Sequence, residues 1–191
     1  LDVWTECNAC LSSFLQKHPE LVRSKRVLEL GAGQGVCGLF AAKLGAAHVC
    51  LSDGDDALLP VMRANIAANQ LGDRCSAVKL LWGQSSAPRA DSSKTASVTD
   101  DSKTVSPRKR RRIDSSSASA APSSSAAVGS ATTSSGMQRF DVLLGAEIVY
   151  VSSAAPKLRA TIDQLLLTRD DREGDTGLFL LAHQVRRAVM K

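Results

Sequence analysis

The sequence predicts an α/β protein built on a doubly wound, mostly parallel β-sheet, and three observations lead to this fold class. Short apolar runs alternate with stretches in which apolar residues recur at helical spacing. The apolar runs are nearly continuous, which is typical of strands buried on both faces of a parallel sheet. A glycine-rich turn at residues 31–35 follows the first of these runs, at a place where such sheets bind ligands.

The expected elements alternate along the chain. Strands are predicted at 26–30, 48–52, 77–82, 140–146 and 177–183. Amphipathic helices are predicted between the first and second, the second and third, and the fourth and fifth of these strands. Gly45 and Gly72 are expected to end the first two of these helices. A further helix before the first strand is indicated by Leu11, Phe14 and Leu15.

The order of the strands predicts where a ligand would bind. Connections between parallel strands are right-handed, which gives a sheet wound in two directions. Ligands then bind outside the carboxyl ends of the strands, where the strand order reverses. The loops after Leu30, Ser52, Leu81 and Ala146 should therefore surround one crevice. The helix before the first strand is expected to bring Trp4 to the rim of this crevice.

Residues 85–136 differ in composition from the rest of the chain. Seventeen of them are Ser, none is aromatic, and 8 Lys+Arg against 4 Asp carry most of the chain's net charge of +5. Such a segment has too little apolar surface to offset the entropy of ordering it. We therefore predict a disordered insertion that divides one folded domain into residues 1–84 and 137–191. The basic run 107–112 is either a nuclear import signal or a solvated charge run.

The composition also excludes several classes of function. No apolar run approaches the roughly 20 residues of a membrane helix. Basic and acidic residues nearly balance outside the insertion, so nucleic-acid binding is not expected. The lone CxxC at residues 7–10 lacks the two further ligands of a zinc site, so no metal is expected. Reduced thiols, with Cys37 and Cys50 buried, fit a cytoplasmic or nuclear protein.

The glycine-rich turn and one acid indicate the kind of cofactor. Gly31, Gly33 and Gly35 lie between a strand and a helix, where glycine lets the backbone approach a ligand closely. Asp53 ends the second strand, and a carboxylate there can accept both hydroxyls of an adenosine ribose. The GxGxxG that begins at Gly33 matches a dinucleotide site. The earlier GxGxG, with Glu29 two residues before it, fits S-adenosylmethionine better.

Aromatic and acidic residues are expected at the same crevice. Trp82, at the end of the third predicted strand, and Trp4 can stack on adenine or face a sulfonium cation, although either can also fill the core. Glu147 follows the fourth strand, and Tyr150 is the only tyrosine of the chain. Together they can line a channel for a cationic amine, in which the carboxylate attracts the ammonium and the ring guides the chain.

Three segments together resemble methyltransferase family 16, the seven-β-strand lysine methyltransferase-like enzymes. They are residues 27–35 (VLELGAGQG), 80–82 (LLW) and 145–150 (GAEIVY). Val3-Trp4 is similar to the family's amino-terminal tryptophan segment. The resemblance covers nearly everything outside the insertion. It implies a Rossmann-like sheet of the class I methyltransferase type, with the final hairpin strands missing from this chain.

The resemblance also implies a role for each matching residue. Glu147 and Tyr150 match the family's acid-x-x-aromatic motif near the acceptor lysine, where the family often has Asp in place of Glu147. The residues expected to bind S-adenosylmethionine are Trp4, Glu29, Gly31, Ala32, Gly33, Gly35, Asp53, Trp82 and Ala146.

The expected function is S-adenosylmethionine-dependent methylation of an accessible lysine on a protein partner, by an enzyme that acts as a monomer. A non-catalytic pseudo-methyltransferase that retains cofactor or partner binding is the main alternative, because of the missing hairpin and the long insertion. A nicotinamide-dependent oxidoreductase is a weaker one, because the Tyr-x-x-x-Lys pair that it would need is absent at Tyr150. A small-molecule acceptor also remains open.

Overall fold

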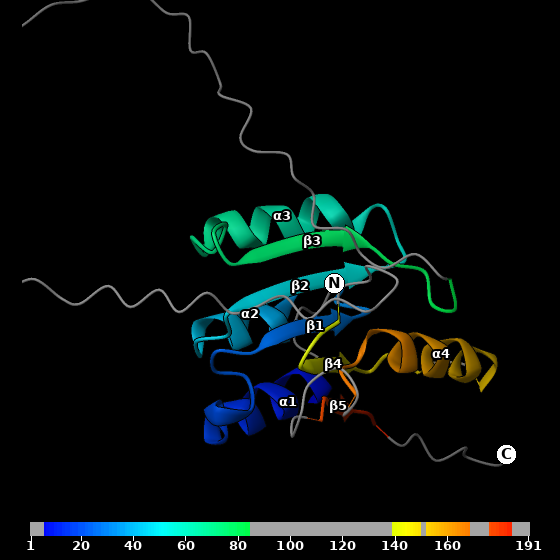
Figure 1. Ribbon diagram of the computed structural model, residues 1–191. Helices are drawn as coiled ribbons and strands as arrows, with labels where there is room; N and C mark the ends of the chain where they lie inside the picture. The colour runs from blue at the N-terminus through cyan, green and yellow to red at the C-terminus, as the bar shows by residue number, and fades with distance from the viewer. Residues whose placement is uncertain (1–5, 85–138, 150–151, 169–175, 185–191) are drawn as a thin grey trace, which may run out of the picture. The chain divides into compact units, whose positions relative to one another are not determined.

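The computed structural model describes residues 6–84, 139–149, 152–168 and 176–184. The strands in these ranges form one parallel sheet in the order β3-β2-β1-β4-β5 (Figure 1). They are β1 (Arg26–Leu30), β2 (His48–Asp53), β3 (Cys75–Lys79), β4 (Val142–Ala146) and β5 (Leu178–Ala182). The predicted insertion, Trp4 and Tyr150 lie outside the described residues.

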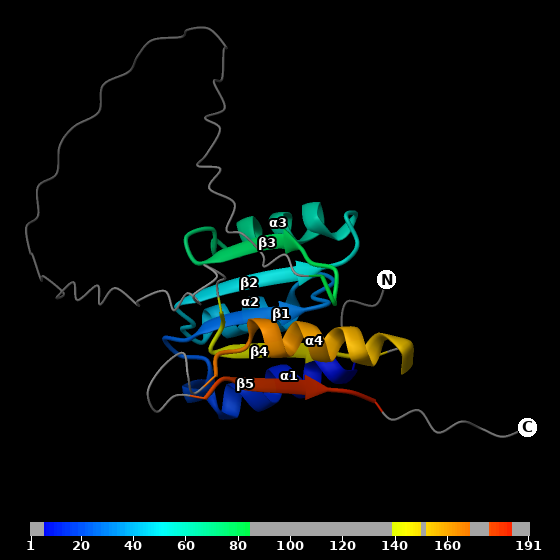
Figure 2. The ribbon, with the colours of Figure 1, turned by 45° about the vertical axis from the view of Figure 1, so that its right-hand side comes forward.

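Helices cover both faces of this sheet. The longer helices are α1 (Glu6–Lys17), α2 (Val36–Lys43), α3 (Leu58–Ala68) and α4 (Ala155–Leu165), and the short ones are η1 (Pro19–Leu21) and η2 (Ser152–Ala154). The first three long helices pack on one face and α4 packs on the other (Figure 2). The longest helix in the described ranges has only 12 residues, and none of these helices qualifies as a membrane span.

The core has two parts because successive residues of each strand point to opposite faces. In β1, Val27 packs with residues of α1, α2 and α3, whereas Leu28 packs with residues of α4. All five residues of β1 are buried. This two-sided burial explains the nearly continuous apolar runs and confirms the predicted α/β fold with a doubly wound parallel sheet.

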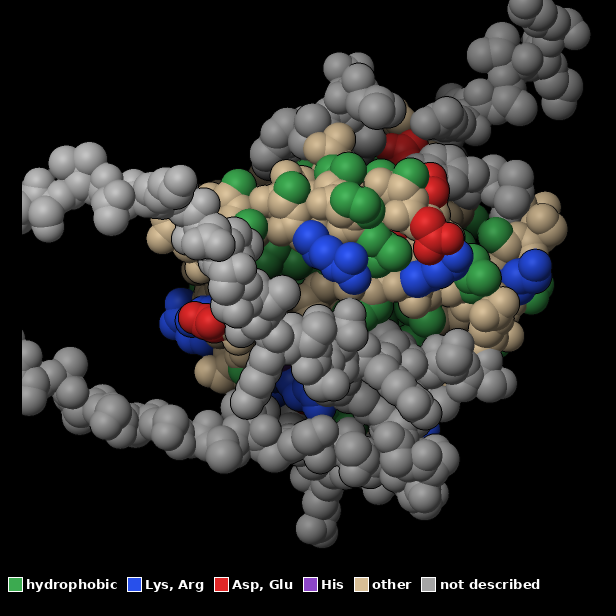
Figure 3. All heavy atoms as spheres, turned by 90° about the horizontal axis from the view of Figure 1, so that it is seen from above, with side chains coloured by type: hydrophobic (Ala, Val, Ile, Leu, Met, Phe, Trp, Pro, Cys, Tyr) green, Lys and Arg blue, Asp and Glu red, His purple; other side chains and the backbone are tan. Residues whose placement is uncertain are grey.

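The helix α3 lies over the edge of the sheet that β3 forms. Met62 and Ile66 of this helix are buried against the core, while Val61 is 37% exposed. Figure 3 looks onto this edge and shows hydrophobic side chains spread among a few charged groups. Arg63 is the only charged residue within α3, so its outer face is mostly small and apolar.

Two predicted details of the secondary structure are wrong. The helix predicted to end at Gly72 ends at Ala68, because Gln70 adopts a left-handed backbone (φ 57°). The Leu71 N–H then donates to the Ile66 carbonyl oxygen at 3.1 Å, which closes the helix end.

The third strand was predicted at 77–82 but runs from Cys75 to Lys79. It pairs with β2 from Val49 to Asp53 and stops where β2 stops. Trp82 therefore lies in the following loop. Phe14, in α1, is 41% exposed and lies against the ring of His18.

Candidate functional site

A cavity of about 480 Å³ is formed by the loops at the carboxyl ends of the strands. The strand order reverses between β1 and β4 at this end of the sheet. The cavity is lined by Gly31, Gly33, Asp53, Gly54, Leu58, Leu80, Leu81, Trp82, Ile148 and Ala154. The four loops predicted to surround one crevice therefore meet there, and they bring four of the predicted cofactor residues together.

Asp53 links the glycine-rich turn to the loop after β2. One oxygen of its carboxylate, Oδ2, accepts the Gly33 N–H at 2.9 Å. The other, Oδ1, accepts the Asp55 N–H at 3.0 Å. These two bonds fix the carboxylate at the wall of the cavity, where the side chain is half-buried. A carboxylate held in this way presents negative charge to a polar group inside the cavity.

Two glycines of the turn have different surroundings: Gly31 is in close contact with neighbouring loops, whereas the space beside Gly33 is open. A Cβ added at Gly31 would lie 2.9 Å from Cγ2 of Ile148 and 3.6 Å from the Trp82 ring. The loops after β1, β3 and β4 therefore approach one another at Gly31. A Cβ added at Gly33 would meet nothing within 4 Å, so the backbone at this point is accessible from the cavity.

Glu29 does not line the cavity, although its position before the turn suggested a cofactor contact. It is 2% exposed, and its carboxylate accepts the Gly38 N–H at 2.8 Å. Burial raises the pKa of Glu29 to about 7, and the nearby charge of Asp53 adds to this, while the N–H groups of Gly38 and Cys37 oppose it. Glu29 therefore caps the start of α2 and supports the glycine-rich turn from a position outside the cavity lining.

Three further predicted cofactor residues, Ala32, Gly35 and Ala146, do not line the cavity. The Ala32 N–H donates to the Ser52 carbonyl oxygen at 2.8 Å. Gly35 has φ 82° immediately before α2, and a Cβ there would lie 2.5 Å from Cδ1 of Leu51. Ala146 is half-buried at the end of β4.

Glu147 is buried directly after β4. Its backbone is left-handed (φ 54°), which is uncommon outside glycine, and its side chain is 6% exposed. Its N–H donates to the Ala182 carbonyl oxygen at 2.8 Å, which fixes the loop to the end of β5. Backbone strain of this kind persists where surrounding contacts hold it, and it concentrates at functional sites.

Sequence reasoning missed two residues that shape the turn. Ile148 lines the cavity and packs against Gly31, and a Cβ added at Gly145 would lie 2.6 Å from its Cδ1 atom. The side-chain amide of Asn65, in α3, donates to the Gln34 carbonyl oxygen at 2.9 Å. The glycines at 31 and 145 signal a close approach, but the sequence does not identify its partner.

Four of the five cysteines are buried and Cys10 is exposed. Cys37 and Cys50 are buried as predicted, and burial raises the pKa of each thiol to about 12. None of the five forms a disulfide in the described ranges. The same ranges contain no group of three or more His, Cys, Asp or Glu that could hold a metal ion.

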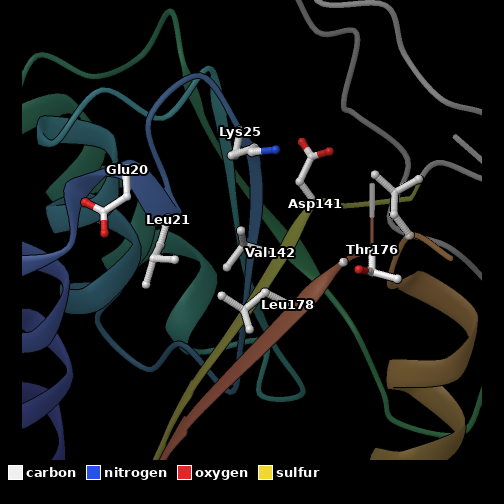
Figure 4. Close-up of a pocket in the computed structure, with 9 residues that line it drawn as sticks. Glu20, Leu21, Lys25, Asp141, Val142, Thr176 and Leu178 are labelled. Atoms are coloured by element: carbon white, nitrogen blue, oxygen red, sulfur yellow. The ribbon is translucent and has the colours of Figure 1, made fainter. Parts of the chain in front are cut away.

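A second cavity, of about 180 Å³, lies at the opposite ends of the strands. Figure 4 shows Glu20, Leu21, Lys25, Asp141 and Leu178 around it, with the amine end of Lys25 extending toward Asp141. These residues lie at or before the amino ends of β1, β4 and β5. Parallel sheets bind their ligands at the carboxyl ends, so the larger cavity is the candidate functional site.

Comparisons with known proteins identify relatives of this chain. The chain is 29% identical over 159 residues to protein-lysine N-methyltransferase EFM3 of Chaetomium thermophilum, which covers 82% of this chain and 35% of that protein. It is 38% identical over 78 residues to calmodulin-lysine N-methyltransferase of Arabidopsis thaliana, covering 39% of this chain and 26% of that one. The chain thus spans about a third or less of the length of these curated relatives.

One solved structure supports the fold. Arabidopsis thaliana protein arginine methyltransferase 10 matches 82% of this chain and 32% of its own, with a TM-score of 0.51 and 14% identity. The family model described as lysine methyltransferase matches residues 1–99, slightly more than half of this chain. The chain therefore belongs to the lysine methyltransferase family, methyltransferase family 16, as its three motif segments predicted.

Proposed function

We propose that this chain binds S-adenosylmethionine in the larger cavity and methylates the side-chain amine of a lysine on a protein. One observation carries the proposal. The open backbone at Gly33, the fixed carboxylate of Asp53 and the indole of Trp82 all line the same cavity. Family membership and the named activities of the relatives support the same chemistry.

The cavity fits this cofactor in size and in the chemistry of its walls. Its volume of about 480 Å³ lies within the roughly 300–1,000 Å³ of small-molecule sites. The backbone at Gly33 is open to it, the carboxylate of Asp53 stands at one wall, and apolar side chains such as Leu58 and Leu80 line others. A nucleoside requires such a combination of polar and apolar surface.

Each cofactor-side residue has a separate task in the proposal. Asp53 accepts the ribose hydroxyls, and the turn at Gly31 and Gly33 lets the ligand approach the backbone. Trp82, together with Trp4, offers an aromatic face to the adenine or to the sulfonium. Glu29, Ala32, Gly35 and Ala146 hold the backbone that forms this site. When bound, S-adenosylmethionine supplies an electrophilic methyl group.

On the acceptor side, Glu147 and Tyr150 receive the lysine side chain. A free lysine has a pKa near 10.4, so the ammonium must lose its proton before it can act as a nucleophile. A poorly hydrated channel lowers that pKa because it disfavours the charged form. Glu147 then serves mainly to orient the amine, and much of the acceleration comes from positioning.

The wider organisation of the protein is also part of the proposal. A folded methyltransferase domain made of residues 1–84 and 137–191 is interrupted by a disordered insertion at 85–136. The protein acts as a monomer in the cytoplasm or the nucleus, and its partner is a protein with an accessible lysine. A membrane or nucleic-acid partner is not part of this function.

Calorimetry and a methyl-transfer assay test this function together. We expect the 191-residue chain to bind S-adenosylmethionine and not NADH, because the GxGxG at residues 31–35 with Glu29 before it fits S-adenosylmethionine better. The Tyr-x-x-x-Lys pair expected of the oxidoreductase is also absent at Tyr150. We expect radiolabelled methyl groups to enter lysine side chains of lysate protein, and replacement of Glu147 by alanine to abolish this transfer.

The outcomes separate the three candidate functions. Binding of NADH without binding of S-adenosylmethionine would exclude the methyltransferase in favour of the oxidoreductase. Binding of S-adenosylmethionine with no methyl transfer by the wild-type chain would indicate a pseudo-methyltransferase. Wild-type transfer rates in the Glu147→Ala variant would remove the acceptor role of Glu147.

A further inference from the structure

Three elements meet beside Glu147: the first turn of α1 and the ends of β4 and β5. Glu147 is bound to β5 through its N–H, which donates to the Ala182 carbonyl oxygen at 2.8 Å. The side-chain amide of Gln184, just beyond β5, donates to the Glu6 carboxylate at 3.1 Å. The first turn of α1 is thereby held over the loop that carries Glu147.

The next residue, Cys7, is buried in the first turn of α1, and this helix packs against β4 and β5. Cys7 is 4% exposed and Glu147 is 6% exposed, so both groups are shielded from water. Burial raises the pKa of the Cys7 thiol, and the hydrogen bond to the Glu147 side chain and the charge of Glu147 raise it further. A thiol that keeps its proton is available as a hydrogen-bond donor.

Polar contacts also fix α1 to the helix that follows the glycine turn. The Cys37 thiol, in the first turn of α2, donates to the Asn8 side-chain oxygen at 3.4 Å. The Ser12 hydroxyl lies 3.9 Å from the sulfur of Cys37. Since Asn8 follows Cys7 directly, the position of Cys7 is set relative to α2 and the cofactor side of the site.

We propose that Cys7 is a positioning residue, whose thiol donates a hydrogen bond to the Glu147 carboxylate and holds it in place on the acceptor side. This inference rests on the proposed function, because Cys7 has this role only if Glu147 orients the amine of the acceptor lysine. A left-handed residue needs contacts that hold it. The N–H bond to Ala182 holds the backbone of Glu147, and the thiol holds its side chain.

The test compares three variants of the 191-residue chain: Cys7→Ala, Cys7→Ser and Cys10→Ser. Cys7→Ala removes the donor, and Cys7→Ser restores one as a hydroxyl. Cys10 is an exposed cysteine on the same helix, so Cys10→Ser controls for the loss of a thiol. Rates of methyl transfer from radiolabelled S-adenosylmethionine into total lysate protein, freed of small molecules, are measured over a range of cofactor concentrations.

Cys7→Ala is expected to lower the maximal rate about tenfold, the effect of losing one hydrogen bond to a charged group. The KM for S-adenosylmethionine should stay within about twofold of wild type, since the cofactor side is unaltered. Cys7→Ser should recover most of the rate, and Cys10→Ser should retain it. Calorimetry with S-adenosylmethionine confirms that each variant remains folded and binds the cofactor.

Two results would overturn the role of Cys7. A wild-type maximal rate in Cys7→Ala would show that the thiol does not position Glu147. If Cys7→Ala and Cys7→Ser lowered the maximal rate equally while cofactor binding stayed intact, the reaction would not depend on a hydrogen-bond donor at position 7. If the wild-type chain itself transfers no methyl group, the proposed function fails and this role fails with it.

Discussion

Asp53→Ala is expected to weaken the binding of S-adenosylmethionine by about 100-fold or more. The carboxylate is expected to accept two hydroxyls of the ribose, and each hydrogen bond to a charged group contributes roughly 1.5–3 kcal/mol. The substitution also releases the N–H groups of Gly33 and Asp55 from their acceptor, so the turn loses part of its order. Isothermal titration calorimetry of the wild type and the variant measures the change in Kd.

Asp56→Ala is the matched control for the loss of a negative charge in the same loop. Asp56 is exposed, pairs with Lys79 and does not line the cavity. Its replacement should leave the Kd within about twofold, because surface ion pairs contribute little. Equal affinities of wild type and Asp53→Ala would show that the cofactor does not depend on this carboxylate.

Glu29→Gln is expected to change how the stability of the fold depends on pH. The pKa of Glu29 is about 7 in the folded chain, against 4.5 as the ordinary value. Between these values the unfolded chain loses the proton and the folded chain keeps it. The stability of the wild type relative to the variant should therefore fall by about 3 kcal/mol as pH rises from 4.5 to 7, and then level off.

Urea denaturation of both proteins at a series of pH values measures this difference. Glu20→Gln, at an exposed carboxylate outside α2, is the control for replacing a carboxylate by an amide. A constant difference between wild type and Glu29→Gln from pH 4.5 to 8 would show that Glu29 is not a buried carboxylate that caps α2.

The parts of the fold that were predictable from sequence are those that local chemistry determines. The first strand was predicted at 26–30 and has those bounds, because an apolar run there ends at a glycine. The end of α3 was not predictable, since it depends on Gln70 adopting a left-handed backbone that glycine usually provides. The end of β3 depends on where its neighbour β2 stops, which is a property of the sheet.

The site shows the same division between local and distant contacts. Gly31, Gly33, Asp53 and Trp82 were predicted at one crevice and line one cavity, because the topology of a parallel sheet brings the ends of its strands together. Glu29 was expected to bind the cofactor and instead caps α2. The sequence contains no sign of which way its side chain points.

The proposed hydrogen bond between Cys7 and Glu147 was also beyond the sequence. The two residues are far apart in the chain, and the CxxC spacing of Cys7 drew attention to metal chemistry instead. Only the packing of α1 against the ends of β4 and β5 brings the thiol to the carboxylate. Contacts of this kind require the tertiary arrangement, because no local pattern encodes them.

The most direct test of the central claim is an NMR titration of the isotopically labelled chain with S-adenosylmethionine. The amide signals of Gly31, Gly33 and Gly54 and the indole signal of Trp82 should shift, because these groups line the larger cavity. The amide signals of Asp141 and Thr176, at the cavity on the opposite side of the sheet, should stay in place. Unchanged signals at the glycine turn at saturating cofactor, or shifts confined to the opposite cavity, would contradict the account.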